Sequence, residues 1–154
     1  MEAFMRIALE EAIRGVKEGH GGPFGAVIVR GGAVVSRAHN RVIETADPTA
    51  HAEMLAIRTA SRVLARFDLS DCMLYTTCEP CPMCLGAVLW ARIGNVIYGC
   101  SREDAAEAGF DDAAFHSVFG EAASDSPVVL IQRDRQACLK AFRKWEEKEE
   151  KIVY

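Results

Sequence analysis

Cys78-Glu79-Pro80-Cys81-Pro82-Met83-Cys84 is the stretch around which this chain is organised, and His51-Ala52-Glu53 is its partner upstream. Together the two pieces supply one imidazole, a closely spaced pair of thiols and a carboxylate. Zinc in a hydrolytic site needs three protein ligands and one open position for water. His51, Cys81 and Cys84 meet that requirement. Glu53 is left free to move protons, so the sequence predicts a catalytic zinc site.

The expected helices explain why these residues share one site. Cys81 and Cys84 fall in the first turn of a helix, three positions apart, so both sulfurs face the same side. The positive end of that helix favours thiolate over thiol. His51 opens the preceding helix, so two helix N-termini face each other across the metal. Glu53 does not lie over His51 on the helix surface, and it is predicted to move protons from a zinc-bound water, whose pKa is roughly 7.

Two other metal sites compete with this interpretation. A structural zinc is closed by four protein ligands, and Cys78 is available as the fourth, although Glu53 would then be an unexplained carboxylate. An iron–sulfur cluster is the second alternative, because Cys78, Cys81 and Cys84 imitate the C-x2-C-x2-C pattern. Residues 85–88 do not supply the fourth cysteine expected there. The remaining cysteines are expected to be buried free thiols: Cys72, Cys100 and Cys138.

Size and composition are those of an ordinary globular domain. A length of 154 residues predicts one domain, spanning 1–154, with enough chain for a real core. Half of the residues are hydrophobic, and the net charge is -4. A protein that wraps duplex nucleic acid usually carries a basic face, so nucleic acid is not the expected partner, although a local basic groove stays compatible with this charge.

The N-terminal segment does not resemble a secretory signal. Residues 1–16 carry five charged side chains among the apolar ones, whereas a signal peptide has an uninterrupted apolar run. No stretch reaches the length that crosses a bilayer, so no membrane association is expected. We therefore expect a cytoplasmic protein. In that compartment the six cysteines are ligands or buried thiols rather than disulfides.

Hydrophobic periodicity predicts the order of the elements. Helices are expected over 1–16, 50–65, 80–91 and about 138–145. Thr49 is the expected N-cap of the helix over 50–65. The helix over 80–91 contains no charged residue and should be buried on all sides. Strands are expected over 24–29, 33–38, 73–77, 95–100 and 128–132, with Gly31-Gly32 as a hairpin turn. Residues 39–49 are expected to form a loop, and residues 101–120 a short helix plus an active-site loop.

This order predicts the fold class. After the opening hairpin, strands alternate with helices, which favours parallel strands with helices on both faces. We therefore expect an α/β protein, a three-layer α/β/α sandwich around a mixed five-stranded sheet.

With these motifs in view, the sequence resembles the cytidine and nucleotide deaminase superfamily, and more closely the small bacterial guanine deaminases of that fold. H-x-E followed by P-C-x-x-C is typical of zinc nucleobase deaminases. The resemblance covers nearly the whole chain. The zinc motifs are shared by the superfamily, whereas AEAGFDD and the terminal tyrosine are more specific. Four stretches carry the resemblance: GGPFGAV (21–27), DPTAHAE (47–53), CEPCPMC (78–84) and DAAEAGFDD (104–112).

The resemblance implies hydrolysis of guanine to xanthine and ammonia with Zn²⁺ as the cofactor. It implies His51, Cys81 and Cys84 as metal ligands, Glu53 as the proton shuttle and Asp112 as a second acid that escorts protons to the departing amine. The implied substrate-binding residues are Asn40, Phe24, Ala52, Trp90 and Tyr154. His20, His39 and His116 have no motif around them and receive no role.

The resemblance also implies a cytidine deaminase-like fold and a homodimer. In relatives of this kind the C-terminal segment, about 134–154, is exchanged between subunits. Tyr154 would close the pocket in cis or in trans.

Other functions stay open at this point. A tRNA adenosine deaminase shares the zinc motifs, but it binds an anticodon loop and should have a basic surface. The tail 145–154 holds four glutamates against two lysines, which favours a small free purine. Cytosine or cytidine deamination is the third possibility, and a non-catalytic zinc-binding module is the fourth.

Overall fold

The computed structural model describes residues 1–120, 126–152 and 154. Within these residues the helices and strands follow in this order: α1 (Ala3–Glu18), β1 (Gly25–Arg30), β2 (Ala33–His39), α2 (Val42–Thr45), α3 (Ala52–Leu64), β3 (Cys72–Cys78), α4 (Pro82–Trp90), β4 (Asn95–Cys100), α5 (Arg102–Glu107), α6 (Ala113–Phe119), β5 (Val129–Gln132) and α7 (Arg135–Glu146).

The strands form one mixed sheet in the order β2-β1-β3-β4-β5. β1 runs antiparallel to both of its neighbours, whereas β3, β4 and β5 are parallel. Because β2 and β3 are each antiparallel to β1, they run in the same direction, and α3 carries the chain over β1 from one to the other. The predicted mixed five-stranded sheet is confirmed.

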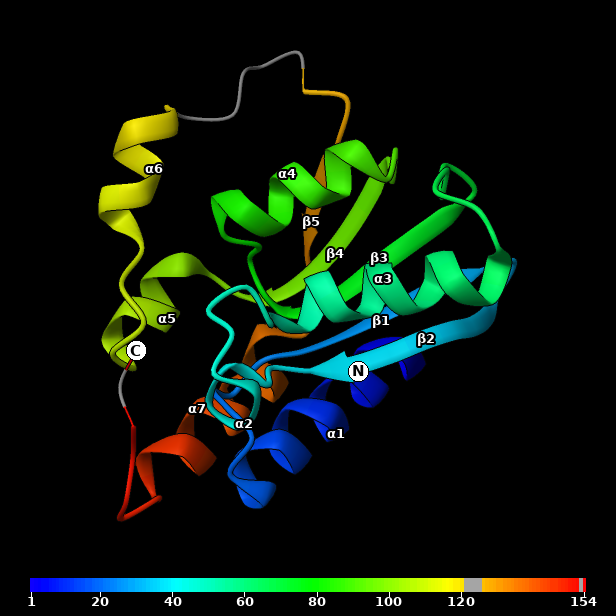
Figure 1. The fold of residues 1–154 in the computed structure, drawn as a ribbon. Coiled ribbons are helices and arrows are strands. Elements are labelled where there is room, and N and C mark those ends of the chain that lie inside the picture. Colours follow the sequence, from blue (N-terminus) through cyan, green and yellow to red (C-terminus); the bar gives the residue numbers. More distant parts are fainter. Residues whose placement is uncertain (121–125, 153) are drawn as a thin grey trace.

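Helices cover both faces of this sheet, which confirms the predicted three-layer α/β/α architecture. In Figure 1, α1 and α7 lie on one face, and α3 and α4 lie on the other. Successive strand residues point to opposite faces. Ile28 and Leu74 accordingly pack in the core under α3 and α4, while Val27 and Tyr75 pack in the core under α1 and α7. The two inner strands β1 and β3 are accordingly buried along nearly their whole length, on both faces.

Two glycine positions shape the N-terminal half. Gly19 ends α1 in the left-handed region, with φ of 75°. Gly31 and Gly32 both have positive φ, 55° and 78°, as the tight β1–β2 hairpin requires. The two turns bring the segment that follows α1 and the end of β2 to the same edge of the sheet.

This edge holds the sequence motifs. β2, β3 and β4 point the same way, so their carboxyl ends meet there, and ligands of open α/β sheets bind outside that edge. Cys78 is the last residue of β3, and the chain turns from it directly into α4. The expected loop 39–49 leaves β2 at the same edge and leads into α3.

Details of this loop correct two expectations. Residues 42–45 form the short helix α2, because the Asn40 side chain accepts a hydrogen bond from Val42 N and the Arg41 guanidinium binds Glu44. Thr49 is not the N-cap of α3. Its hydroxyl donates instead to Asp47, and helix α3 begins after His51.

Residues 80–120 correct two more expectations. α4 is not buried on all sides: within it only Cys84 and Val88 are buried, because its outer face is covered only in part, by α6. Residues 101–120 contain two short helices rather than one. A capping box between Ser101 and Asp104 starts α5, and α6 follows after Gly109 has turned the chain with a φ of 96°.

The C-terminal part folds back onto the N-terminal helix. α7 packs on α1 and β4 of the same chain, and Tyr154 reaches the edge of the sheet that holds the motifs. A single domain over 1–154 and exchange of residues 134–154 between subunits stay predictions; residue 153 lies outside the described residues. Among the described helices none is long and apolar enough to span a membrane.

Candidate metal centre and adjoining cavity

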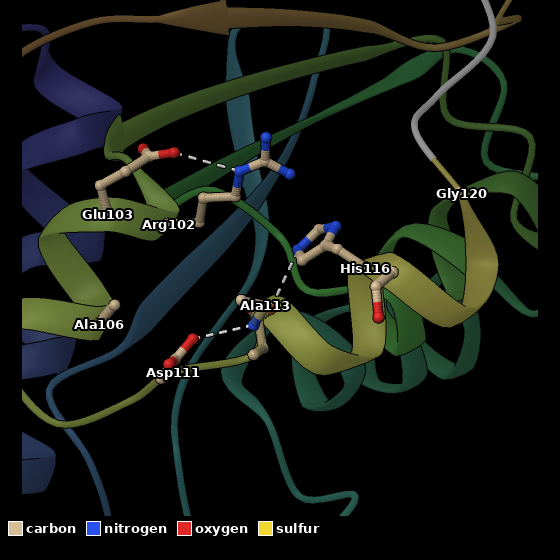
Figure 2. A pocket seen from close by; sticks show the side chains of 9 residues that line it. Arg102, Glu103, Ala106, Asp111, Ala113, His116 and Gly120 are labelled. Atoms are coloured by element: carbon tan, nitrogen blue, oxygen red, sulfur yellow. Dashed lines mark hydrogen bonds and ion pairs between the residues drawn. The ribbon is translucent and has the colours of Figure 1, made fainter.

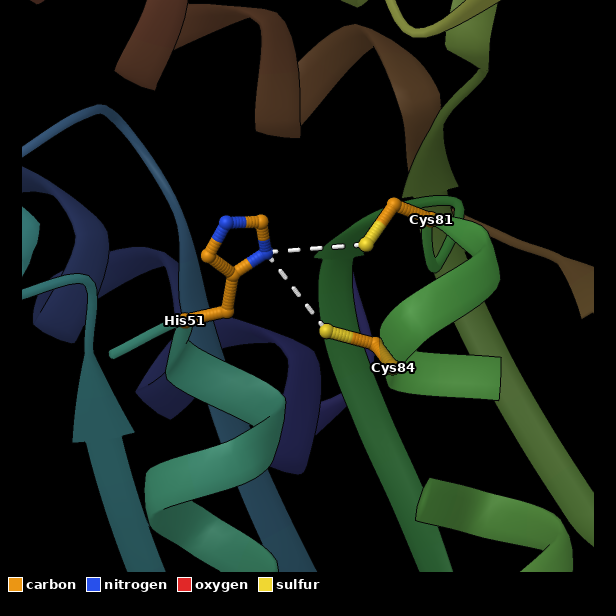
Figure 3. A group of neighbouring side chains, drawn as sticks. All are labelled: His51, Cys81 and Cys84. Carbon is orange, nitrogen blue, oxygen red and sulfur yellow. Dashed lines mark hydrogen bonds between the residues drawn. The ribbon is translucent and has the colours of Figure 1, made fainter. Parts of the chain in front are cut away.

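His51, Cys81 and Cys84 place three ligand atoms around one point. The Nδ1 atom of His51 lies 3.6 Å from the Sγ atom of each cysteine. Figure 3 shows the imidazole at the start of α3 facing the two sulfurs at the start of α4. His51 and Cys81 are partly buried and Cys84 is fully buried.

Local sequence explains this meeting of two helix ends. His51 is the N-cap of α3, and Cys81 is the N-cap of α4 with Pro82 directly after it. Proline suits the first helical turn because the N–H that it lacks would have no partner there. Cys84 follows three residues later on the same side of the helix. The positive ends of both helices therefore point at the space between the three donors, where a thiolate charge is stabilised.

The distances fit a zinc ion. With Zn–N bonds of about 2.05 Å and Zn–S bonds of about 2.3 Å, tetrahedral geometry puts the nitrogen and sulfur ligands about 3.6 Å apart. The observed distances from Nδ1 to the two sulfurs are 3.6 Å each. Imidazole with two thiolates is also a ligand set that suits zinc and leaves one tetrahedral position open.

The charges in the site favour a bound cation. The hydrogen bond from Cys84 and the neighbouring imidazole of His51 lower the pKa of the Cys81 thiol to about 4. The same hydrogen bond and burial raise the pKa of Cys84. Burial opposes protonation of His51, but the Cys81 hydrogen bond and the charge of Glu53 raise its pKa overall. The Cys81 sulfur is thus a thiolate, the form that binds a metal ion.

Cys78 does not join the three ligands. Its Sγ atom contacts the backbone oxygen of Ser101 at 3.5 Å, and burial raises the pKa of its thiol well above the usual value. Among the described residues, His51, Cys81 and Cys84 group together without Cys78, which argues against a closed four-ligand zinc and against an iron–sulfur cluster.

Glu53 lies beside the three ligand residues but is not grouped with them. It is 5% exposed; its Oε1 atom accepts a hydrogen bond from Thr76, and its Oε2 atom lies 3.6 Å from the sulfur of Cys84. Burial raises the pKa of Glu53, partly offset by the charge of His51. A buried carboxyl group with a raised pKa holds a proton more readily than an exposed one, as a proton carrier must.

A cavity of about 420 Å³ adjoins the metal centre and is lined in part by His51 and Cys81. This volume is in the range of small-molecule sites. Its walls combine aromatic rings with a few polar groups. The lining residues are Phe24, Asn40, Pro48, His51, Glu53, Cys78, Glu79, Cys81, Arg102, Ala105, Phe110, Asp111, Asp112, Phe115 and Tyr154.

Asn40 is the most rigidly held polar group of this wall. Its side-chain oxygen accepts hydrogen bonds from Gly22 N at 3.3 Å, Val42 N at 3.1 Å and the Tyr154 hydroxyl at 2.7 Å. The backbone donors define which end of the amide is oxygen. The amide nitrogen is the end that stays available to donate to a ligand.

The aromatic wall brings together residues from distant parts of the chain. The Phe24 and Phe110 rings meet edge to face at 4.9 Å between centroids, and Tyr154 packs on Phe110 at 5.9 Å. Burial of the ring end raises the pKa of Tyr154 to about 12, so its hydroxyl is a hydrogen-bond donor at neutral pH. The role of Phe110 was missed in the sequence, although it lies in the AEAGFDD stretch between a turn glycine and Asp112.

Asp112 joins this cavity to an outer one of about 560 Å³. The His116 ring nitrogen lies 3.2 Å from the Asp112 carboxylate, one helical turn away. Figure 2 shows the outer cavity, with Arg102, Glu103 and Ala106 on one side and His116 on the other. Asp112 is thus a carboxylate that reaches both the ligand space and solvent.

Two residues implied by the resemblance lie away from the cavity. Trp90 ends α4, about eight residues or 12 Å from the cysteine end of that helix, and is 86% exposed. Trp90 is not among the residues that line the cavity, and its substrate-binding role stays a prediction. Ala52 is fully buried in the core under α3 and is not among the lining residues given above. The other implied residues, Phe24, Asn40 and Tyr154, lie together in the wall.

Comparison with known proteins finds deaminases among the relatives of this chain. Residues 1–100 match the family model described as the cytidine and deoxycytidylate deaminase zinc-binding region. The chain is 47% identical over 144 residues to guanine deaminase of Bacillus subtilis, covering 94% of this chain and 92% of the relative. It is 50% identical over 97 residues to tRNA-specific adenosine deaminase of Aquifex aeolicus, which covers 63% of this chain and 64% of that protein.

The solved structures agree with the sequence comparison. The X-ray structure of guanine deaminase from Bacillus subtilis superposes with a TM-score of 0.75 and 45% identity, covering 100% of this chain and 99% of that one. The match to guanine deaminase thus extends through α5, α6 and the C-terminal segment, whereas the family model ends at residue 100.

Proposed function

This chain belongs to the cytidine and deoxycytidylate deaminase family, and from that premise we propose that it is a zinc-dependent enzyme that hydrolyses guanine to xanthine and ammonia. The observation that carries the proposal is the match to guanine deaminase over nearly the full length of both chains, together with an open three-ligand site beside a buried glutamate.

His51, Cys81 and Cys84 are proposed to hold Zn²⁺, since their spacing fits its bond lengths. A zinc ion bound there would act as a Lewis acid and make water nucleophilic near neutral pH. Because α3 and α4 both begin at the site, the three donors are held by rigid elements rather than by a mobile loop.

Glu53 is proposed to carry protons. Removal of the amino group requires that oxygen from water bonds to the ring carbon that carries the amine and that a neighbouring ring nitrogen gains a proton. The Glu53 carboxylate would take that proton from water and give it to the ring. Its raised pKa and its burial beside the ligands support this role.

Asp112 is proposed to deliver the proton that the leaving group needs. Breaking the carbon–nitrogen bond releases ammonia only if the amine nitrogen has been protonated. Asp112 lines the cavity and also borders the outer cavity, so its carboxylate can take protons from solvent. The contact with His116 restricts the carboxylate to one orientation.

Recognition of the purine is assigned to Asn40, Phe24 and Tyr154. The Asn40 oxygen is held by three donors, so its amide nitrogen is presented to a ring acceptor such as the guanine carbonyl oxygen. Phe24 and Tyr154 supply apolar contact to the flat ring. A base without a matching acceptor would leave the amide unpaired, which costs specificity factors of roughly 10⁴.

Deamination of adenosine in tRNA is the second candidate, because the match to the Aquifex aeolicus protein is also strong. That match covers about two thirds of the chain, whereas the guanine deaminase match covers 94%. The C-terminal segment of this chain also lies over the cavity through Tyr154, which limits access for an anticodon loop.

A homodimer and a cytoplasmic location are proposed as well. Leu89, Trp90 and Phe119 are exposed on α4 and α6, and apolar surface of this kind is favoured at subunit interfaces. All six cysteines are free thiols, as a reducing compartment keeps them. Sedimentation would test the dimer, and Trp90→Glu should dissociate it.

The decisive experiment measures ammonia from the zinc-loaded protein with guanine, adenine, cytosine and cytidine, and inosine formation in tRNA. We expect release from guanine at least roughly 10³-fold faster than from the other bases. Rapid inosine formation in tRNA with no turnover of guanine would overturn the proposal.

A further inference from the structure

A second group of metal-ligating side chains lies outside the centre described above. Glu18 is the last residue of α1, His20 comes two residues later, and His39 ends β2. One ligand atom from each lies within 4.8 Å of the others. His20 Nδ1 is 2.9 Å from His39 Nε2 and 3.3 Å from a Glu18 carboxylate oxygen. We call these three residues the His20–His39 cluster.

Glu11 prepares His39 to bind a cation. Its carboxylate is 4% exposed and accepts a hydrogen bond from His39 Nδ1 at 3.0 Å. Arg14 and Arg37 bind the same carboxylate at 2.7 and 3.3 Å. Arg14 Nη2 also lies 3.4 Å from this ring nitrogen, but the Glu11 carboxylate is closer at 3.0 Å, so the imidazole proton is assigned to Nδ1 and the lone pair to Nε2. Metal-binding histidines are held in this way, with a carboxylate on the second ring nitrogen.

The ring of His39 has little freedom to turn away. A Cβ atom added at Gly15 would lie 2.7 Å from the ring, so only glycine at that position of α1 leaves room for it. The His20 ring stacks beside it at 5.2 Å between centroids. His20 and Glu18, whose side chains are 26% and 45% exposed, give an ion a route from solvent.

We propose that Glu18, His20 and His39 form a second metal site that takes a divalent transition-metal ion of the zinc type. Two imidazoles and a carboxylate form a ligand set suited to such ions. The 3.3 Å separation of His20 Nδ1 and Glu18 already equals the spacing of about 3.3 Å between light ligands of a tetrahedral ion. The facing nitrogens, His20 Nδ1 and His39 Nε2, are 2.9 Å apart and need to separate by a few tenths of an ångström. His20, whose side chain is 26% exposed, has room for that movement.

Surrounding charges leave the site open to an added cation. The nearby carboxylate of Glu44, 3.7 Å from His20 Nδ1, is already bound by Arg41, so it is not counted as a ligand. Lys148 lies close by, with its amino group bonded to the backbone oxygen of Val16. Among the described contacts, Glu18 has only His20 as an ionic partner, and its negative charge is thus available to the ion.

An ion in this site would join two chain segments that support the cavity wall. His39 directly precedes Asn40, and His20 directly precedes the glycine pair whose Gly22 N–H binds the Asn40 oxygen. The His20 backbone oxygen also accepts from Glu44 N at 3.0 Å. The site therefore bridges the end of α1 to the loop after β2. This inference does not depend on the proposed deaminase function, because it concerns different ligands.

Titration with cobalt(II) distinguishes the two sites. Metal-stripped, folded protein is titrated while calorimetry measures binding and absorbance measures the spectrum of the bound ion. Ion bound by Cys81 and Cys84 produces a thiolate-to-cobalt band, whereas ion bound by the His20–His39 cluster does not. We expect the wild-type chain to bind two cobalt ions, one that produces the thiolate-to-cobalt band and one that does not. His20→Ala and Glu18→Gln should weaken the band-free equivalent by at least about tenfold and leave the band unchanged.

Glu10→Gln is the matched control, because Glu10 is an exposed glutamate on the same helix that pairs with Arg6 at the surface. It should keep both equivalents with wild-type affinity. His39 is not the first choice for substitution, because its buried ring packs on Gly15 and its loss endangers the fold. Three results would each overturn the second site. They are binding of only one cobalt ion per wild-type chain, binding of the ion without the thiolate band that survives His20→Ala, and equal weakening of that binding by Glu10→Gln. Absence of the thiolate band would count against the first site alone.

Discussion

The hydroxyl of Tyr154 donates a hydrogen bond of 2.7 Å to the side-chain oxygen of Asn40, across 114 residues of sequence. The same hydroxyl accepts from Gly22 N at 2.9 Å. The last residue of the chain thus completes the wall that the loop after β2 begins. Although Tyr154 is 43% exposed as a residue, its ring end is inserted between Phe110 and the loop. The C-terminus is therefore a structural part of the cavity.

Removing the Tyr154 hydroxyl should weaken substrate binding more than the chemical step. In Tyr154→Phe the ring contact with Phe110 remains, but Asn40 loses its shortest hydrogen bond and its amide is less well oriented. We expect KM for guanine to rise by roughly 3- to 10-fold, the worth of about one hydrogen bond, with kcat nearly unchanged. Tyr98→Phe, on β4 outside the cavity wall, is the control. Equal kinetics for wild type and Tyr154→Phe would remove this bond from the site.

Glu53→Gln should separate metal binding from turnover. The amide keeps the size of the side chain and a partner for Thr76, but it cannot carry a proton. We expect one zinc per Cys81–Cys84 site as in the wild type, and a kcat lower by roughly 10²- to 10⁴-fold. Metal analysis and an ammonia assay on the same sample measure both. Glu107→Gln, an exposed glutamate on α5, should match the wild type. Full turnover in Glu53→Gln would exclude a proton-carrying role.

Zinc removal should abolish turnover reversibly, and two cysteine variants should behave differently. Cys84→Ala removes one of the three grouped donors, so zinc affinity and turnover should fall by at least about 100-fold. Cys78→Ala removes a buried thiol that faces Ser101, so zinc content should stay at the wild-type level. Chelation followed by readdition of Zn²⁺ provides the reference. Loss of zinc from Cys78→Ala, with its fold intact, would instead indicate a four-ligand site.

Asp104 should contribute stability that depends on pH. Hydrogen bonds from Arg135 first, and then from the Ser101 backbone, hold the pKa of this buried carboxyl below its usual value. Its folded pKa lies below the unfolded value of about 3.9, so the stabilisation is fully present above pH 4 and is lost as the pH falls through the folded pKa. Asp104→Asn should therefore cost about 1–3 kcal/mol in the free energy of unfolding at pH 7.

Denaturant unfolding at several pH values tests this prediction. The difference between wild type and Asp104→Asn should shrink steadily below pH 4. Asp111→Asn, an exposed carboxylate nearby whose side chain bonds its own turn at Ala113, is the matched control for pH-dependent charge. A difference that stays constant down to the lowest pH at which both proteins fold would show that the charge of Asp104 contributes nothing.

The sequence by itself predicted the fold class, because apolar periodicity records burial directly. The alternation of strands with helices after the hairpin predicted a sheet covered on both faces, and Gly31-Gly32 predicted the hairpin between the first two strands. Spacing within one turn likewise placed Cys81 and Cys84 on the same side of α4. These are local properties, set by the geometry of a helix or strand over a few residues.

Only the tertiary structure decided which distant residues meet. The 3.6 Å distances from His51 to the two cysteines depend on how α3 and α4 pack on the sheet, and the Tyr154–Asn40 bond depends on the path of the whole chain. The same cause placed Glu11 behind His39 and left Trp90 at the exposed end of α4. Residue type and spacing fix which atoms are able to bind an ion or a base, whereas long-range packing fixes the distances between them, and coordination and hydrogen bonding require those distances to within a few tenths of an ångström.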